Sequence, residues 1–246
     1  SVMYANNEIG TIQPIEDIAK IAKEKGIYFH TDAVQAVGHI PINVKELGVD
    51  LLTISAHKLN GPKGVGALYI KKGVSINSFI NGGDQEMKRR AGTENTAGIV
   101  GFGKAIELAV ADIEEKNNYI RNLRDTTING ILSNISDTFL NGDMEKRLSG
   151  NVNICFKYVE GESILLHLDK LGICASTGSA CTSASLEPSH VLLAIGVPPE
   201  FAHGSLRLTF DAQNTIEEVN YLLKVLPDII SHLRQMSPLY NNLKNS

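Results

Sequence analysis

The chain has 246 residues, of which 43% are hydrophobic and 20% charged, proportions typical of a globular protein with a sizeable core. The formal net charge of -4 gives no basic surface for nucleic acid, and every apolar run stays below the roughly 18 residues of a membrane span. The three cysteines are too few, and odd in number, for a disulfide framework, so we expect a reducing, cytoplasmic environment.

The first part of the chain alternates strands and helices. VMYA (2–5) predicts a short buried strand, and Pro14 fits the first turn of a helix that ends near Gly26. Further strands are predicted over 27–31, 50–54 and 65–70. This alternation predicts an α/β fold with a largely parallel sheet and helices on its faces.

The pattern changes from about Thr96 onward. A helix rich in small and apolar residues is predicted over 96–115, and a charged helical stretch follows it to about Ile135. The later elements are predicted as strands near 138–141 and 151–157, a helix over 162–171 and a strand over 205–210. We therefore place a domain boundary near residue 114, with one domain over 1–114 and a C-terminal α+β domain over 115–246.

The last predicted helix begins at Thr215, because Glu218 follows at the spacing of a capping box. Pro227 lies inside its apolar stripe and is expected to kink or split it. At the other end, the chain starts directly in an apolar strand. We therefore expect it to be a piece of a longer protein, the alternative being a natural start close to Ser1.

Polar side chains follow two of the predicted strands. Asp32 and Gln35 come after the strand 27–31, and Ser55, His57 and Lys58 come after the strand 50–54. Singly, these residues have ordinary interpretations as a helix N-cap, a packed histidine and a solvated lysine. Together, at the carboxyl ends of strands where α/β proteins bind ligands, they point to pyridoxal phosphate (PLP) chemistry.

Five stretches together resemble the NifS/IscS-type cysteine desulfurases, which are PLP enzymes of the aspartate-aminotransferase fold. The stretches are NNEIG (6–10), HTDAVQAVG (30–38), SAHKLNGPKGVGALY (55–69), RRAGTEN (89–95) and STGSACTSASLEPSHVL (176–192). The resemblance runs to about residue 235. It implies the C-terminal half of the large PLP-binding domain followed by a small α+β domain, with the N-terminal part of the large domain absent.

The resemblance implies how PLP is bound. Lys58 forms the Schiff base with the cofactor aldehyde, and Asp32 pairs with the pyridine nitrogen. Gln35 contacts the ring hydroxyl oxygen, and Ser55 and His57 hold the phosphate. No metal site is implied.

Three further residues match positions that reach the substrate or a second subunit. Thr93 is similar to the threonine that contacts the phosphate of the other subunit's cofactor, which implies a homodimer. Asn7 is similar to the asparagine near the ring oxygen and the substrate carboxylate. Arg207, in SLRLTF, is similar to the arginine that binds this carboxylate with its planar fork.

Cys181 lies in STGSACTSAS, a small, polar stretch without periodicity that predicts a mobile loop. The resemblance implies that its thiolate attacks the sulfur of PLP-bound cysteine, so that alanine leaves and a persulfide remains. The alternative is a buried, inert thiol. Cys155 and Cys174 are interpreted as packing residues.

The sequence thus predicts a PLP-dependent cysteine desulfurase that acts on L-cysteine and passes sulfur to an iron–sulfur scaffold or another acceptor protein. One alternative is a selenocysteine lyase-like PLP enzyme. Another is a non-catalytic, partner-binding remnant, because part of the cofactor site is expected upstream. The chain departs from the family pattern at Asp84 and at Asp211 and Ala212.

Overall fold

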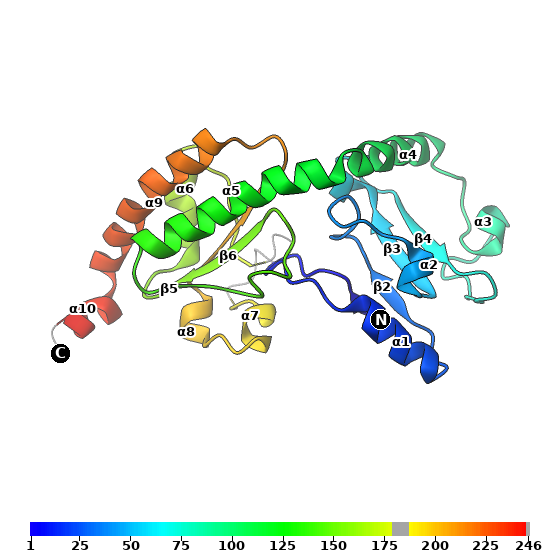
Figure 1. The fold of residues 1–246 in the computed structure, drawn as a ribbon, viewed down its shortest axis with the longest axis horizontal. Helices are drawn as coiled ribbons and strands as arrows, with labels where there is room; N and C mark the ends of the chain where they lie inside the picture. Colours follow the sequence, from blue (N-terminus) through cyan, green and yellow to red (C-terminus); the bar gives the residue numbers. More distant parts are fainter. Residues whose placement is uncertain (179–186, 245–246) are drawn as a thin grey trace. The chain divides into compact units, whose positions relative to one another are not determined.

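The computed structural model describes residues 1–178 and 187–244 (Figure 1). By its contacts the chain divides into two compact units, Ser1–Ala5 with Gln13–Ile113, and Asn6–Ile12 with Glu114–Ser246. The division after Ile113 lies next to the boundary drawn from the sequence. Residues 6–12, however, join the second unit although they lie early in the chain.

The first unit is built on a four-stranded sheet in the order β1-β2-β3-β4. The strands are β1 (Val2–Met3), β2 (His30–Asp32), β3 (Leu51–Ser55) and β4 (Gly66–Ile70). β1, β2 and β3 are parallel and β4 is antiparallel to β3, which confirms the predicted, largely parallel sheet. β2 begins later than expected, because the exposed Ile27 and Tyr28 precede it rather than belong to it.

The helices of the first unit are α1 (Ile15–Glu24), α2 (Val44–Leu47), the 3-10 helix η1 (Ala56–Leu59), α3 (Gln85–Lys88) and α4 (Thr96–Val110). α1 buries Ile15 and Ala19, as its periodicity predicts, and Gly26 follows it at φ +66°. The helix predicted over 96–115 ends early. Asp112 has a left-handed φ of 50°, which an α-helix does not accommodate, and a new helix begins at Ile113.

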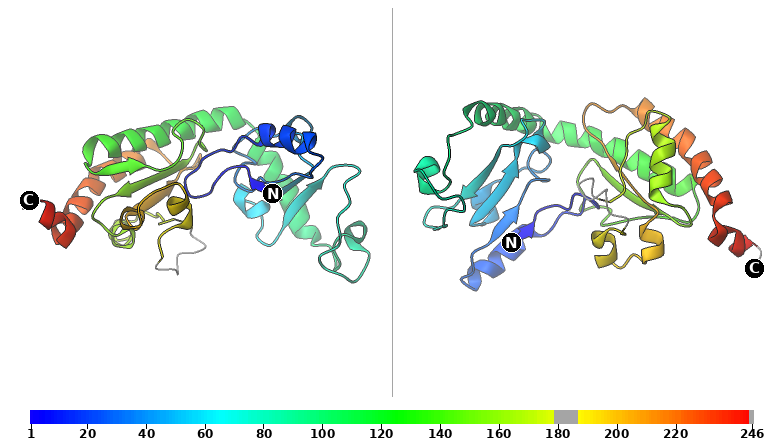
Figure 2. Two further views of the ribbon diagram at one scale, coloured as in Figure 1. Left: turned by 90° about the horizontal axis from the view of Figure 1, so that it is seen from below. Right: turned by 180° about the vertical axis from the view of Figure 1, so that it is seen from behind.

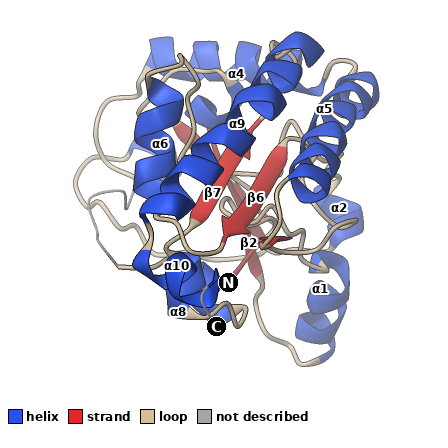
Figure 3. Cartoon of the chain, turned by 90° about the vertical axis from the view of Figure 1, so that its left-hand side faces the viewer, coloured by secondary structure: helices blue, strands red, loops and turns tan. Residues whose placement is uncertain are grey.

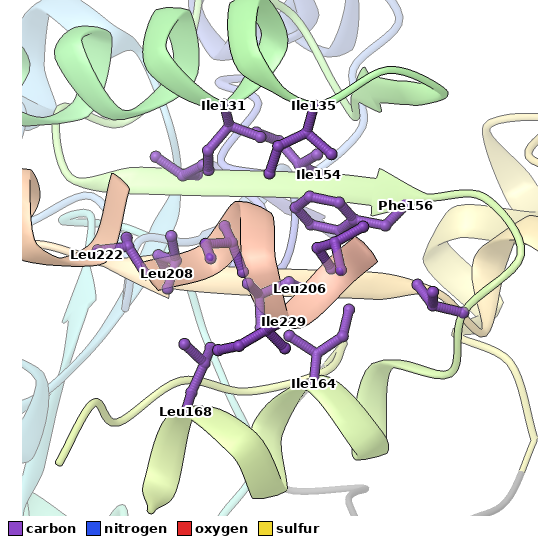
Figure 4. Packing of buried hydrophobic residues seen from close by; sticks show 14 of the residues in the cluster. Ile131, Ile135, Ile154, Phe156, Ile164, Leu168, Leu206, Leu208, Leu222 and Ile229 are labelled. Carbon is purple, nitrogen blue, oxygen red and sulfur yellow. The ribbon is translucent and has the colours of Figure 1, made fainter. Parts of the chain in front are cut away.

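The second unit has an antiparallel sheet in the order β5-β6-β7, formed by β5 (Thr138–Leu140), β6 (Asn151–Phe156) and β7 (Ser205–Thr209). Side chains alternate across a strand, so Val152, Ile154 and Phe156 point to one face. Three helices cover this face (Figures 3 and 4): α5 (Ile113–Asn134), α6 (Gly161–Asp169) and α9 (Ile216–Met236). This apolar layer is the main core of the unit.

The opposite face of the same sheet is polar but equally buried. β6 presents Asn151, Asn153 and Cys155 there, and Arg207 of β7 pairs with Asn153 in register. The face is met by residues 6–12, the dark blue stretch that reaches this sheet in Figures 1 and 2, and by two short helices. These are α7 (His190–Ala194) and α8 (Pro199–Ala202); α10 (Pro238–Lys244) follows α9.

The capping box predicted at Thr215 is confirmed, since Thr215 and Glu218 exchange both hydrogen bonds. The predicted split at Pro227 is wrong, because α9 continues through it to Met236. Leu226 precedes the proline and Ile229 follows it, and both are buried in the same core. Their burial offsets the roughly 3 kcal/mol that an interior proline costs. Within the described chain, no helix has both the length and the apolar character needed to cross a membrane.

Candidate functional site

The carboxyl ends of β2 and β3 bring two of the predicted site residues to one edge of the first sheet. Asp32 is the last residue of β2 and pairs in register with Thr53, and Ser55 ends β3 two residues later. Asp32 is exposed, and its Oδ1 accepts a hydrogen bond from the N–H of Val34 at 2.9 Å. Its carboxylate therefore lies at the position where α/β sheets bind ligands.

Lys58 projects from η1, a short turn whose first and last residues are buried. Ala56 and Leu59, the first and last residues of η1, are buried beneath α4 against Phe102 and Ala105. The two residues between these anchors, His57 and Lys58, are exposed. The turn therefore presents the lysine amine to its surroundings instead of burying it.

Backbone contacts also hold this turn. The N–H of Ala56 donates to the carbonyl of Val65 at 3.1 Å, and the N–H of Gly61 donates to the carbonyl of Ala56 at 2.9 Å. A Cβ at residue 61 would lie 2.9 Å from the same Ala56 oxygen, so the close return of the chain requires glycine. These backbone hydrogen bonds hold the chain on both sides of Lys58.

Ser55 and His57 form a pair at the start of the same turn. Ser55 Oγ lies 2.7 Å from His57 Nδ1. A serine hydroxyl that donates to Nδ1 leaves the neutral ring with its proton on Nε2, where an anionic ligand can accept it. The pair is therefore suited to an anion such as a phosphate.

These groups fit PLP by the chemistry of their side chains. The ligand has a protonated pyridine nitrogen, an aldehyde and a phosphate, and it needs a carboxylate, an amine and hydrogen-bond donors in return. Asp32 supplies the carboxylate, and Lys58 supplies the amine. The donors come from the Ser55–His57 pair, and all of these groups lie at or just after the ends of the neighbouring strands β2 and β3. Gln35 is half-buried and follows in the turn after β2.

Thr93 lies in the segment between α3 and α4 and is exposed. Two residues later, Asn95 caps α4 through a hydrogen bond from the N–H of Gly98 at 3.1 Å. In the described chain no hydrogen bond joins Thr93 to Lys58 or His57. Its contact with a second subunit's cofactor stays a prediction.

Arg207 and Asn7 meet on the polar face of the second sheet. Arg207 Nη1 donates to the carbonyl of Asn7 at 3.1 Å, across 200 positions of sequence. The backbone of Arg207 is held on both sides, by Asn153 of β6 and by a bridge to Ser176. The two residues predicted to bind the substrate carboxylate are thus in contact, and the arginine is half-buried on a rigid strand.

Residue Glu8 was not singled out from the sequence, although it lies within the stretch NNEIG. It is only 2% exposed, and its Oε2 accepts a hydrogen bond from Ser189 Oγ. A glutamate is rarely buried without a partner, but nothing in its local sequence shows that the partner is 181 positions away.

Cys181 lies outside the described residues. Of the other two cysteines, Cys155 is fully buried, as predicted, whereas the packing role predicted for Cys174 is wrong because that residue is exposed. Cys174 follows Gly172 in the turn after α6, so its apolar neighbours in sequence do not place it in the core.

The burial of Cys155 has a testable consequence. Burial raises the pKa of its thiol to about 11, against the smaller opposing effect of the Asn141 side chain, which donates to Sγ at 3.1 Å. At a pH of about 8 the thiol therefore stays protonated, and alkylation by iodoacetamide is expected to reach Cys174 but not Cys155. Peptide mass spectrometry of the native protein measures this, with urea-unfolded protein as the control. Modification of Cys155 before Cys174 would contradict the structure.

Within residues 1–178 and 187–244, no group of three or more His, Cys, Asp or Glu side chains could hold a metal ion. The groups described at the first sheet's carboxyl edge are a carboxylate, a serine–histidine pair and a lysine amine.

Comparison with known proteins shows which protein family has this fold and these groups. The chain belongs to the aminotransferase class-V family, whose model matches residues 1–222, and the family is PLP-dependent. The chain is 62% identical over 239 residues to a protein of Methanosarcina thermophila named cysteine desulfurase IscS, covering 97% of this chain and 59% of that protein. The resemblance to the NifS/IscS group and the assignment of PLP are confirmed.

Solved structures agree with the fold. A NifS-like protein superposes with a TM-score of 0.85 at 39% identity, over 94% of this chain and 60% of that one. A structure titled SspA in complex with cysteine gives a TM-score of 0.68 at 34% identity, over 87% of this chain and 58% of that one. The chain thus spans about three fifths of the length of the relatives that it matches.

Proposed function

We propose that this chain is part of a cysteine desulfurase, which converts L-cysteine to L-alanine and keeps the sulfur as a persulfide on Cys181. The observation that carries the proposal is the exposed Lys58, held on η1 beside the Ser55–His57 pair and the carboxylate of Asp32. The reaction itself is inferred from the relatives, which include a protein named cysteine desulfurase IscS. The structure titled SspA in complex with cysteine supports the choice of substrate.

PLP, when bound, supplies an electron-withdrawing ring that weakens the Cα–H and Cβ–S bonds of an attached amino acid. Asp32 would hold the ring nitrogen in its protonated form, Gln35 would contact the ring hydroxyl oxygen, and Ser55 and His57 would hold the phosphate. Lys58 would hold the cofactor, and its amine would accept the proton from Cα as general base. Each of these roles uses a group at the carboxyl edge of the first sheet.

In the second unit, Arg207 binds the substrate carboxylate and Asn7 orients this arginine through its carbonyl. The Cys181 thiolate then attacks the substrate sulfur: an S–S bond forms, the Cβ–S bond breaks, and the carbon product takes up a proton to become alanine. The sulfur count balances, because one cysteine and one thiol give one alanine and one persulfide.

The remaining assignments concern the assembly. We propose a homodimer in which Thr93 contacts the phosphate of the other subunit's cofactor. An iron–sulfur scaffold or another sulfur-acceptor protein would collect the persulfide sulfur. A cytoplasmic location suits a free thiol in this role, because a reducing compartment keeps Cys181 from forming a disulfide.

Turnover of L-cysteine by the PLP-loaded enzyme tests the proposal. We expect alanine and persulfide on Cys181 to form in equal amounts in a single turnover, measured by amino-acid analysis and mass spectrometry. Cys181→Ser should retain the PLP absorbance and lose persulfide transfer. Alanine formation from L-selenocysteine that is faster than from L-cysteine, and equal in the Cys181→Ser variant, would instead favour a selenocysteine lyase.

A further inference from the structure

Glu8 is a buried charged group to which the proposed reaction gives no role. Its side chain is 2% exposed, and Ser189 Oγ donates to its Oε2 at 2.5 Å. A buried carboxylate is costly unless it is hydrogen-bonded, so its partner is part of what keeps it there. The partner, Ser189, lies just after the stretch that carries Cys181.

The backbone of Glu8 is held in place independently of its side chain. Its carbonyl accepts hydrogen bonds from Nδ2 of Asn151 at 3.0 Å and of Asn153 at 3.1 Å. Its N–H donates to Asn6 Oδ1 at 2.8 Å. The next residue, Ile9, belongs to a buried apolar cluster on the same face of the second sheet. The backbone of Glu8 therefore has anchors that do not depend on Ser189.

Ser189 joins Glu8 to α7. Its hydroxyl donates to the carboxylate and accepts hydrogen bonds from the N–H groups of Val191 at 3.2 Å and Leu192 at 3.3 Å. Leu192 is fully buried and packs in the same cluster as Ile9. The chain that follows the Cys181 stretch is thus fixed to residues 8 and 9 by both polar and apolar contacts.

Gly178 brings the other end of the stretch to the same carboxylate. A Cβ on this residue would lie 3.3 Å from Glu8 Oε2 and 3.4 Å from Ser189 Cβ. Its φ of +50° is in the left-handed region, which favours glycine. Gly178 lies three residues before Cys181 and Ser189 eight residues after it, so the carboxylate that binds Ser189 also lies beside the residue at the other end of the stretch.

We propose that Glu8 is a positioning residue for Cys181, because its carboxylate holds Ser189, which follows the stretch that carries this thiol, and lies beside Gly178, which precedes the thiol. The inference rests on the proposed function, in which Cys181 receives the sulfur. The neighbouring residue, Asn7, accepts a hydrogen bond from Arg207. Residues 7 and 8 therefore connect the arginine assigned to the substrate carboxylate with Ser189, which follows the cysteine stretch.

Four variants of the PLP-loaded enzyme test this role. Glu8→Ala and Ser189→Ala each remove one partner of the hydrogen bond, whereas Glu8→Gln keeps an oxygen that can accept from Ser189. Because Ser189 also caps α7, the matched control is Thr215→Ala, which removes the cap of α9 in the same unit. If Glu8→Ala does not fold, Ser189→Ala gives the same information at a partly buried position.

The first measurement is the alkylation rate of Cys181 by iodoacetamide, resolved from Cys155 and Cys174 by peptide mass spectrometry. Freeing the ends of the stretch is expected to raise this rate by about threefold or more in Glu8→Ala and Ser189→Ala. Glu8→Gln and Thr215→Ala should stay close to the original rate. The double variant Glu8→Ala with Ser189→Ala should show no further increase, because each single change already removes the same hydrogen bond.

The second measurement is single-turnover persulfide formation. A misplaced thiol is expected to lower its rate by up to about a hundredfold in Glu8→Ala, with the cysteine concentration at half-maximal rate unchanged and recovery in Glu8→Gln. Alkylation and persulfide rates that are unchanged in Glu8→Ala, or equally changed in Thr215→Ala, would overturn the positioning role. An enzyme that makes no alanine from cysteine would refute the proposed function instead, while the alkylation rates would still test Glu8.

Discussion

Replacing Lys58 with alanine is expected to remove covalent PLP binding and desulfurase turnover together. The amine has two assigned tasks, attachment of the cofactor and acceptance of the Cα proton, and alanine can perform neither. Loss of a positioned general base alone lowers the rate by about 10²–10⁴-fold. The change should leave the fold intact, because Lys58 is exposed and its turn is held by the buried Ala56 and Leu59.

Borohydride reduction followed by peptide mass spectrometry measures the attachment. The original enzyme should carry a reduced PLP adduct on the peptide that contains Lys58, and the Lys58→Ala variant should carry none. Lys63 provides the matched control, since it is also exposed and lies in the same stretch, SAHKLNGPKG. Lys63→Ala should keep both the adduct and the activity. A Lys58→Ala enzyme that still shows a trapped adduct and normal turnover would refute the assignment.

The stretch 55–64 also shows how far the sequence alone could go. Strand periodicity located β3, and the identity of the residues after it indicated PLP, because these features depend on local sequence. The reason that Lys58 faces outward is not local. It follows from the packing of Ala56 and Leu59 against Phe102 and Ala105 of α4, more than forty residues away, and a single sequence does not show that contact.

On the polar face of the second sheet, the contacts join segments that are even further apart in the sequence. Asn7, Glu8 and Arg207 lie in stretches that look like an irregular turn and a short strand. Their contacts span 200 positions from Asn7 to Arg207 and 181 from Glu8 to Ser189. Periodicity reports which side of a strand is buried, but not which distant segment buries it. The membership of residues 6–12 in the second unit therefore became visible only in the structure.

Local exceptions had local causes that propensity alone weighs incorrectly. Pro227 disfavours a helix interior, yet the buried residues on both sides of it keep α9 continuous. Asp112, an ordinary residue by composition, ends the small-residue helix through its left-handed backbone. At Pro227 tertiary packing decides the outcome against the local preference, whereas at Asp112 the backbone conformation of one residue does.

Arg207→Lys is expected to weaken cysteine binding while leaving PLP attachment unchanged. Arginine offers a carboxylate two parallel hydrogen bonds from a planar fork, and lysine offers a single point charge. Losing a charge-assisted hydrogen bond of about 1.5–3 kcal/mol should raise KM for cysteine by roughly 10–100-fold. The backbone pairs of β7 with Asn153 and Ser176 do not depend on the side chain, so the strand should stay in place.

The measurement is steady-state kinetics with L-cysteine, together with the PLP absorbance and the melting temperature. Arg121→Lys is the control, because this arginine is exposed on α5 and its Nη1 donates only to Asn118 at 3.2 Å among the contacts described. It should leave KM and stability unchanged. If Arg207→Lys lowers the melting temperature but not the affinity for cysteine, the arginine serves only to hold the Asn7 carbonyl, and another group must bind the substrate carboxylate.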